Sequence, residues 1–154
     1  MSEDATFRVR PVTVSTYVPA SPETVFEFIS DTRNDPIWCP NVTEVTQVNG
    51  VGVGVGSAFR FHQSVEMRGR ALESDVDVEI VELGERSIRW RVEDRFQIRD
   101  VKVEVSPEDD GSLVEQTTTA IFKRKPGVAK WLYPILARRT FKDQFRRLSD
   151  HLER

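Results

Sequence analysis

Hydrophobic and polar residues alternate along most of the chain before residue 123. Side chains two positions apart share one face of a β-strand, so each alternating run predicts a strand with one buried and one solvated face. Seven such runs predict a curved antiparallel sheet whose outer side is open to water. The predicted strands lie at 7–18, 41–48, 59–67, 76–80, 88–92, 101–105 and 114–122.

Two short helices are predicted between the first and second strands. Ser21-Pro22-Glu23 begins the first helix. Serine caps free N–H groups, proline is favoured at the first helical position, and an acid suits the positive end of the helix dipole. A second short helical turn is expected around Ile37 and Trp38, before Pro40.

The last segment, 123–154, is basic and has the spacing of an amphipathic helix. Its apolar residues form two groups roughly a third of a turn apart, and Pro134 lies where the pattern shifts. Because proline removes a backbone donor and clashes with the preceding turn, we expect a short helix, a kink and then a long helix. The two groups are Val128, Trp131, Leu132 and Ile135, then Ala137, Phe141, Phe145, Leu148 and Leu152.

Length and composition predict one water-soluble globular domain spanning residues 1–154. The 154 residues are enough for one core, and 38% hydrophobic with 31% charged residues is typical of a globular protein. No stretch approaches the ~18 uninterrupted apolar residues of a membrane span. The start, Met1–Asp4, is acidic and lacks the apolar run of a secretory signal, so we expect a cytoplasmic location.

Charge and cysteine content exclude several function classes. The net charge of −3 combines ten basic and three acidic residues from Lys123 onward, or +7, with −10 in the rest of the chain. An acidic body argues against nucleic-acid binding. Cys39 is the one cysteine, and His62 and His151 are the two histidines, too few for a disulfide or a zinc site. We therefore predict no metal and no cofactor.

Several motifs carry a resemblance to a known family. They are the strand Val14–Val18 leading into residues 19–26, Phe28-Ile29-Ser30-Asp31, Trp38-Cys39-Pro40, and Val53–Ser57 before a strand. With the order of elements, these motifs resemble the START-like (SRPBCC) superfamily, in particular the polyketide cyclase/dehydrase branch and its small bacterial relatives. The resemblance implies an α+β helix-grip fold, a seven-stranded antiparallel sheet curved around a long C-terminal helix. Superfamily members include lipid and sterol carriers, hormone receptors, polyketide cyclases and chaperone activators, so the fold alone does not choose a function.

Strand parity predicts the chemistry of the interior. If the apolar face of each strand points at the helix, the polar residues that share this face are all neutral. They are Gln63, Ser74, Gln116 and Thr118. General acid–base catalysis needs a titratable group, so this wall argues against an enzyme, and no catalytic residue is assigned. The pattern changes between Ile98 and Val101, where a bulge would turn Asp94 or Arg99 inward. His62, like Glu73 and Asp75, has the outward parity.

The favoured function is binding or transport of a small hydrophobic ligand, lipid-like or polyketide-like, between the sheet and the C-terminal helix. Two alternatives stay open: a cyclase or aromatase that acts by positioning its substrate, and a protein-interaction module with a filled core. Gln63 and Gln116 either contact the ligand or bond to neighbouring side chains or trapped water. The candidate ligand contacts are Phe59, Phe61, Gln63, Val65, Val76, Val78, Trp90, Val103, Gln116, Thr118, Phe122, Phe141 and Phe145.

A basic face on the last helix has two interpretations. Arg139, Lys142 and Arg146 lie together on the side away from Phe141 and Phe145. They form either a solvated face that offsets the helix dipole or a surface for transient contact with anionic lipid.

Overall fold

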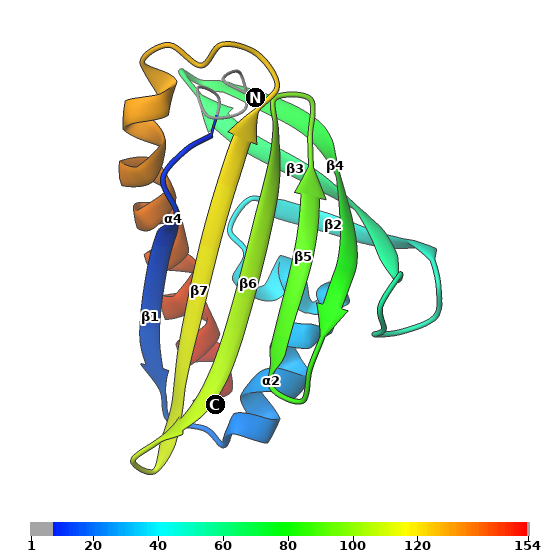
Figure 1. Cartoon of the computed structure of the whole chain (residues 1–154), viewed down its shortest axis with the longest axis vertical. Coiled ribbons are helices and arrows are strands. Elements are labelled where there is room, and N and C mark those ends of the chain that lie inside the picture. The colour runs from blue at the N-terminus through cyan, green and yellow to red at the C-terminus, as the bar shows by residue number, and fades with distance from the viewer. Residues whose placement is uncertain (1–7, 154) are drawn as a thin grey trace.

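Residues 8–153, the part of the chain that the computed structural model describes, form one curved antiparallel sheet with helices on its open side (Figure 1). The strands pair in the order β1-β7-β6-β5-β4-β3-β2. The predicted α+β helix-grip fold with seven strands is confirmed. The expected strand start at Phe7 lies outside the described residues. The strands are β1 (Val12–Val18), β2 (Val42–Asn49), β3 (Ala58–Met67), β4 (Arg70–Leu83), β5 (Ser87–Glu93), β6 (Gln97–Glu108) and β7 (Gly111–Phe122).

The helices lie where the sequence places them, between β1 and β2 and after β7. Ser21 caps the first one, since its Oγ accepts a hydrogen bond from the Thr24 N–H at 3.2 Å, and Pro22 is its first residue. Among residues 8–153, no helix is long and apolar enough to cross a membrane. The helices are α2 (Pro22–Ser30), the short 3-10 helix η1 (Thr32–Asn34), α3 (Asp35–Trp38) and α4 (Ala129–Leu152).

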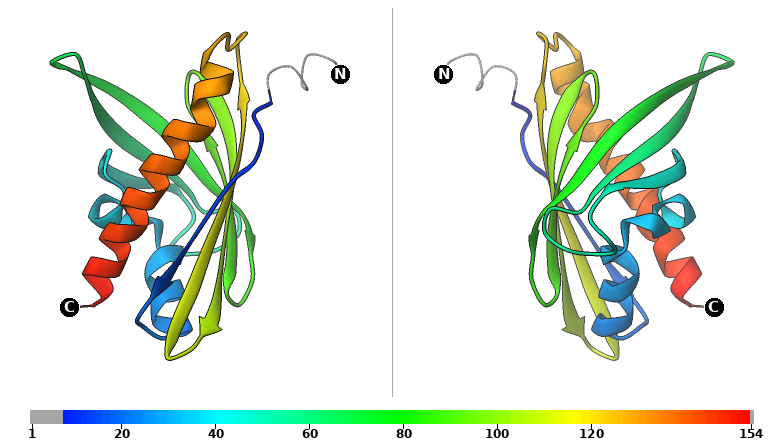
Figure 2. Two further views of the ribbon diagram at one scale, coloured as in Figure 1. Left: turned by 90° about the vertical axis from the view of Figure 1, so that its left-hand side faces the viewer. Right: turned by 90° about the vertical axis from the view of Figure 1, so that its right-hand side faces the viewer.

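The C-terminal helix is continuous. The predicted division into a short and a long helix is wrong, because α4 runs unbroken through Pro134. Pro134 is the sixth residue of α4, so its missing N–H removes one hydrogen bond next to a turn whose N–H groups have no helical partners in any case. Figure 2 shows α4 lying across the open side of the curved sheet.

The apolar residues of α4 shift to another side of the helix near Pro134, and this shift separates solvent-exposed residues from buried ones. Trp131 and Ile135 of the first group are 77% and 63% exposed, whereas Phe145 and Leu148 of the second are 1% and 0% exposed. Trp131 and Ile135 therefore face solvent, whereas Phe145 and Leu148 face the sheet. Sequence spacing identifies both stripes but does not say which of them meets the core.

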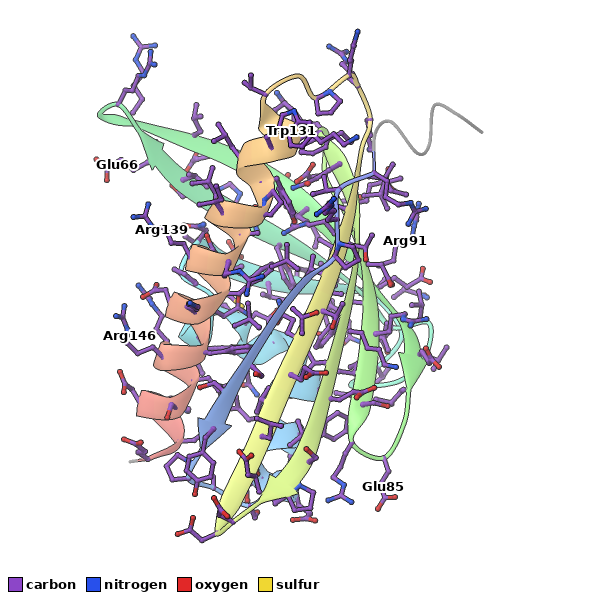
Figure 3. All side chains as sticks on the ribbon, turned by 60° about the vertical axis from the view of Figure 1, so that its left-hand side comes forward. Glu66, Glu85, Arg91, Trp131, Arg139 and Arg146 are labelled. Atoms are coloured by element: carbon purple, nitrogen blue, oxygen red, sulfur yellow. The ribbon has the colours of Figure 1, made fainter. Side chains whose placement is uncertain are left out.

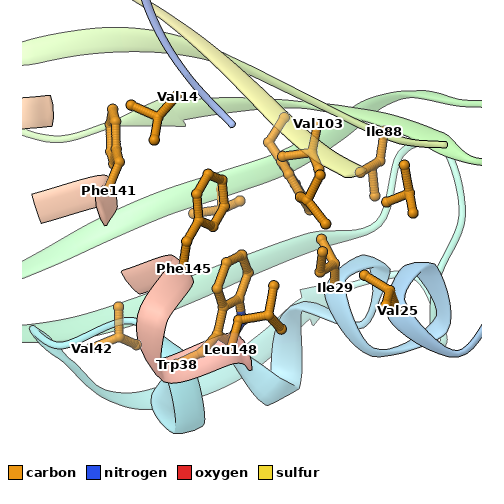
Figure 4. Close-up of a cluster of buried hydrophobic side chains, with 14 of the residues drawn as sticks. Val14, Val25, Ile29, Trp38, Val42, Ile88, Val103, Phe141, Phe145 and Leu148 are labelled. Carbon is orange, nitrogen blue, oxygen red and sulfur yellow. The ribbon is translucent and has the colours of Figure 1, made fainter. Parts of the chain in front are cut away.

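The C-terminal half of α4 closes a dense core, which we call the filled half (Figure 4). The rings of Phe145 and Trp38 stack with centroids 6.3 Å apart and an angle of 10° between their planes. Close packing of this kind leaves no room for a ligand. The filled half comprises Val25, Ile29, Ile88, Val103, Phe145 and Leu148, and Trp38 lies at its border with the rest of the interior.

Candidate ligand-binding site

A cavity of about 480 Å³ lies between the open face of the sheet and the N-terminal half of α4. We call this region the hollow half. Strands β3 to β7 form one wall of the cavity, α4 forms the opposite wall, and α3 with the loop that follows it forms one end. The lining is mainly apolar, with aromatic side chains such as Phe61, Trp90 and Phe141.

Pairing between strands aligns the apolar wall. Val78 on β4 pairs with Val92 on β5, and Trp90 on β5 pairs with Val101 on β6. Residues directly opposite each other in an antiparallel pair point to the same face, so these four side chains form one continuous surface inside the cavity. The alternating pattern of the sequence thus becomes a lining in three dimensions.

The predicted ligand contacts divide into two sets. Seven line the cavity: Phe61, Gln63, Val78, Trp90, Gln116, Phe122 and Phe141. Five others are buried elsewhere in the interior, namely Phe59, Val76, Val103, Thr118 and Phe145. Val65 is partly buried on β3, outside the cavity wall. Parity identifies the face of a strand but not the position along it, so sequence did not separate the lining from the core.

Charged side chains also line the cavity, and the expectation of a wall with only neutral polar groups is wrong. Asp35, Asp94 and Arg99 all lie on the wall. Arg99 is in phase with Val101, and β6 pairs with β7 without a register break from Gln97 to Glu108. Arg99 therefore lies inward without the bulge that the sequence left open. Counting back in twos from the buried valines of β6 would have placed Arg99 inward.

Asp94 has a structural role at the β5–β6 turn. Its Oδ1 accepts hydrogen bonds from the N–H groups of Phe96 at 2.7 Å and Gln97 at 2.9 Å. These bonds are typical of an aspartate that fixes a turn. Asp94 thereby sets the position of Gln97 and of the strand that carries Arg99.

Asp35 contributes a carboxyl group with altered acidity. Burial raises the pKa of Asp35 well above its usual value, while a hydrogen bond opposes this rise. In that bond, Trp38 Nε1 donates to Asp35 Oδ1 at 3.3 Å. Burial likewise raises the pKa of the neighbouring Cys39 thiol, helped by the charge of Asp35. A thiol of raised pKa is a poor nucleophile, which agrees with a packing role for Cys39.

Tyr133 on α4 is a lining residue that the sequence analysis missed. It precedes Ala137 by four residues and Phe141 by eight, so the inner stripe of α4 extends back to it. Burial raises the pKa of the Tyr133 hydroxyl, and Arg99, which lies against this hydroxyl, opposes the rise. The Tyr133 ring meets the Phe122 ring edge-on, with centroids 5.9 Å apart.

Some polar groups of the interior have protein partners. Gln116 Nε2 donates to Thr118 Oγ1 at 3.4 Å, and Trp90 Nε1 donates to Thr32 Oγ1 at 3.3 Å. Gln116 therefore has a structural partner although it also lines the cavity, and Gln63 lines the cavity beside it. The two interpretations of the Gln116 amide are compatible.

His62 lies on the outer face of the sheet, as its parity predicts. Its Nδ1 is 3.1 Å from Asp75 Oδ1 and its Nε2 is 3.4 Å from Glu73 Oε1 on the neighbouring strand. Hydrogen bonds to Asp75 and Glu73 raise the pKa of His62. Within residues 8–153, no three His, Cys, Asp or Glu side chains are placed to hold a metal ion.

Comparison with known proteins gives one family and many similar folds. Residues 10–154 match the family model described as "Polyketide cyclase / dehydrase and lipid transport". No curated protein matches the sequence. A START superfamily protein from Mycobacterium smegmatis is 18% identical, with a TM-score of 0.72 over 93% of this chain and 97% of that one.

Two further solved structures show the range of similar proteins. The protein TTHA0849 from Thermus thermophilus is 19% identical, with a TM-score of 0.71 over 91% of this chain and 94% of that one. The di-domain ARO/CYC protein StfQ from the steffimycin biosynthetic pathway is 13% identical, with a TM-score of 0.71 over 97% of this chain and 52% of that one. At these identities the similarities show a shared fold.

Proposed function

The chain belongs to the polyketide cyclase/dehydrase and lipid transport family, and we propose that it binds and carries a small hydrophobic ligand, lipid-like or polyketide-like, in the cavity beneath α4. The observation that carries this proposal is the cavity of about 480 Å³ with mainly apolar walls. Pockets for small ligands typically measure roughly 300–1,000 Å³ and are lined in this way. The cavity favours ligand binding over an interaction module with a filled core.

The walls suggest how the ligand is held. Phe61, Trp90 and Phe141 offer large apolar surfaces, and burying a ligand against them contributes roughly 25 cal/mol per Å² of apolar area. The amides of Gln63 and Gln116 lie on the same wall and would orient a polar group of the ligand. Affinity thus comes from area and orientation from a few polar groups.

Binding of the uncharged fluorescent probe N-phenyl-1-naphthylamine tests the proposal. We expect its fluorescence to rise on addition of the protein and the rise to be lost in Ala137→Phe. Ala137 is 8% exposed and lines the cavity, so the larger side chain occupies the ligand's space. Asp150→Phe, which adds the same ring at an exposed position of α4, is the control. Equal binding by the wild type and Ala137→Phe would contradict the proposal.

A second candidate function is a polyketide cyclase, favoured by the ionisable groups in the cavity. Burial raises the pKa of the Asp35 carboxyl, which favours its protonated form, and Tyr133 offers a hydroxyl on the α4 wall of the same cavity. A cyclase with dehydration would convert a linear poly-β-ketone to a product lighter by one water for each double bond formed. A carrier would return the compound with its mass unchanged. Mass spectrometry after incubation with the wild type and Asp35→Asn distinguishes the two functions.

The outer face of α4 supports ligand exchange at an anionic lipid surface. Successive helical residues turn by about 100°, which places the exposed first apolar group of α4 and the basic face 139–146 on one line along the helix. Apolar side chains at one end of this line and cations at the other suit insertion between lipids with contact to anionic headgroups. Insertion of these apolar side chains, which lie beside the cavity, would bring the bound ligand close to the lipid. The line comprises Val128, Trp131, Leu132 and Ile135, then Arg139, Lys142 and Arg146.

The charges on this line differ in their partners. Figure 3 shows Arg139 and Arg146 on the side of α4 away from the sheet. Arg146 pairs with Asp143 on the same helix. Within the described part of the chain, Arg139 and Lys142 form no salt bridge with another residue. A solvated basic face accounts for the cations. It does not account for Trp131, a large apolar side chain on the same line of α4 that is 77% exposed.

Sedimentation with vesicles tests this surface. We expect binding to vesicles of phosphatidylcholine and phosphatidylglycerol at low salt, and weaker binding at high salt because salt screens the attraction. Changing Arg139, Lys142 and Arg146 to Glu should abolish it. A variant with Arg33, Arg60 and Arg91 changed to Glu has the same net charge and should retain part of it. Equal vesicle binding by the wild type and the variant with reversed charges on α4 would contradict the proposed surface.

A further inference from the structure

Two polar atoms in the hollow half have no hydrogen-bond partner. Arg99 Nε and Gln97 Oε1 are both buried and unpaired within residues 8–153, and both residues line the cavity. They lie two positions apart on β6, so their side chains leave the strand on the same face. One is a donor and the other an acceptor. Buried polar groups in proteins nearly always have a partner, so an unpaired donor beside an unpaired acceptor indicates a group that binds there.

The protein supplies no counter-ion for Arg99. No residue in the described part of the chain forms a salt bridge with it. Asp94, which also lines the cavity, uses its Oδ1 to fix the β5–β6 turn. Tyr133 lies against Arg99 but carries no charge to neutralise it. The guanidinium therefore presents its charge to the cavity.

We propose that the cavity selects ligands whose apolar body ends in an anionic oxygen group, a carboxylate or sulfonate, with an adjacent hydroxyl or N–H. Arg99 Nε would donate to the anionic oxygen, the Tyr133 hydroxyl would donate to a second oxygen, and Gln97 Oε1 would accept from the adjacent O–H or N–H. Planar guanidinium donors match such anions well, and the bond is strengthened by charge. The apolar body would lie along Trp90 and Phe141. This inference rests on the proposed function, because it assigns a ligand class to the same cavity.

Two probes that differ in one group test it. 8-Anilinonaphthalene-1-sulfonate carries a sulfonate beside its anilino N–H, and N-phenyl-1-naphthylamine is the same molecule without the sulfonate. We expect Arg99→Gln to weaken binding of the sulfonate by about tenfold or more, as for loss of a hydrogen bond to a charged group, and to change binding of the neutral probe by less than about twofold. Arg91→Gln removes a charge from an exposed position of β5 outside the cavity and should change neither.

Binding of the neutral probe distinguishes failure of the anionic-head inference from failure of the proposed function. If both probes bind the wild type and Arg99→Gln affects them equally or not at all, the anionic-head inference is overturned and the cavity remains a ligand site. If neither probe binds, the proposed function fails and the inference fails with it. Retained binding of the neutral probe also shows that the variant is folded.

A measurement on the unaltered cavity covers the case in which Arg99→Gln does not fold. The Nε–H signal of Arg99 in a ¹⁵N NMR spectrum is identified by its absence in Arg99→Lys. We expect the sulfonate probe to shift this signal, because the Nε–H gains a charged acceptor, and the neutral probe to leave it nearly unchanged. An Arg99 Nε–H signal that is insensitive to the sulfonate while the probe is bound would overturn the inference.

Discussion

The two halves of the interior are built from the same sheet and the same helix, yet one is filled and the other is hollow. In the filled half, Phe145 and Leu148 of α4 reach Trp38 and the helix α2, and the side chains interlock (Figure 4). In the hollow half, Tyr133, Ala137 and Phe141 of the same helix face a cavity of about 480 Å³. The short helix α2 packs into the filled half, whereas α3 forms one end of the cavity. The comparison teaches that the cavity exists where the side chains of α4 do not extend far enough to pack against the sheet.

The largest expected difference comes from one substitution made in both halves. Phe145→Ala should lower the free energy of unfolding by about 3–5 kcal/mol, because it opens a cavity in close-packed surroundings. Phe141→Ala, one turn earlier, should cost about half as much, since part of that ring already faces empty space and has fewer contacts to lose. Urea unfolding of the two variants checks the difference. Equal losses would contradict the division into two halves.

Enlarged side chains should give the opposite contrast. Val103→Phe in the filled half should cost about 1–3 kcal/mol, because Val103 is fully buried and the ring must displace its neighbours. Ala137→Phe should change the free energy of unfolding by less than about 1 kcal/mol, because the ring enters existing space. The same urea experiment measures both. A strongly destabilised Ala137→Phe would indicate that the hollow half is packed in solution.

Asp35, on the wall of the hollow half, should make stability depend on pH. Its pKa is raised in the folded protein, so the folded state holds this proton at pH values where the unfolded state has lost it. Stability should therefore fall as pH rises from about 4, the usual aspartate pKa, through the raised folded pKa. Asp35→Asn lacks this loss and should be the more stable protein at neutral pH.

The size of this gain is about 1.4 kcal/mol for each unit by which the folded pKa exceeds the unfolded one. Urea unfolding of both proteins between pH 4 and 8 measures it. The two stability curves should converge at the acid end and separate as pH rises. Parallel curves would show that folding does not raise the pKa of Asp35.

The smallest effect is expected on the outer surface of the hollow half. Trp131 is 77% exposed, so Trp131→Ala should change the free energy of unfolding by no more than about 0.5 kcal/mol. The same variant should weaken binding to anionic vesicles, because it removes an apolar side chain from the proposed lipid surface. A large loss of stability would place Trp131 in the core and remove the reason for that surface.

Much of the fold could be predicted because its signals are local. Ser21-Pro22 begins a helix through contacts with its immediate neighbours, and the alternation of Val76 and Val78 assigns their inner face without knowledge of the partner strand. The resemblance to a known family supplied the helix-grip arrangement. These signals identified the concave face of the sheet and therefore most of the aromatic lining.

The polar end of the cavity could not be predicted to the same extent, since it depends on where the elements meet. Arg99 was within reach, because the register of β6 is unbroken, but the apolar Ile98 indicated the opposite parity for this end of the strand. Tyr133 and Trp131 are two residues apart on α4 and lie on different sides of it. Which stripe meets the sheet depends on the path of α4 over the cavity. Asp35 lies on a short helix, where strand parity gives no information.

Transfer of magnetisation between a bound probe and methyl groups of the protein tests the central claim most directly. With N-phenyl-1-naphthylamine bound, we predict nuclear Overhauser effects from its rings to the methyl groups of Val78, Val92 and Ala137, which line the hollow half. Methyl groups of the filled half, such as those of Val25, should show none. Effects confined to the exposed methyl groups of Ile135 would place the probe on the surface and contradict the account.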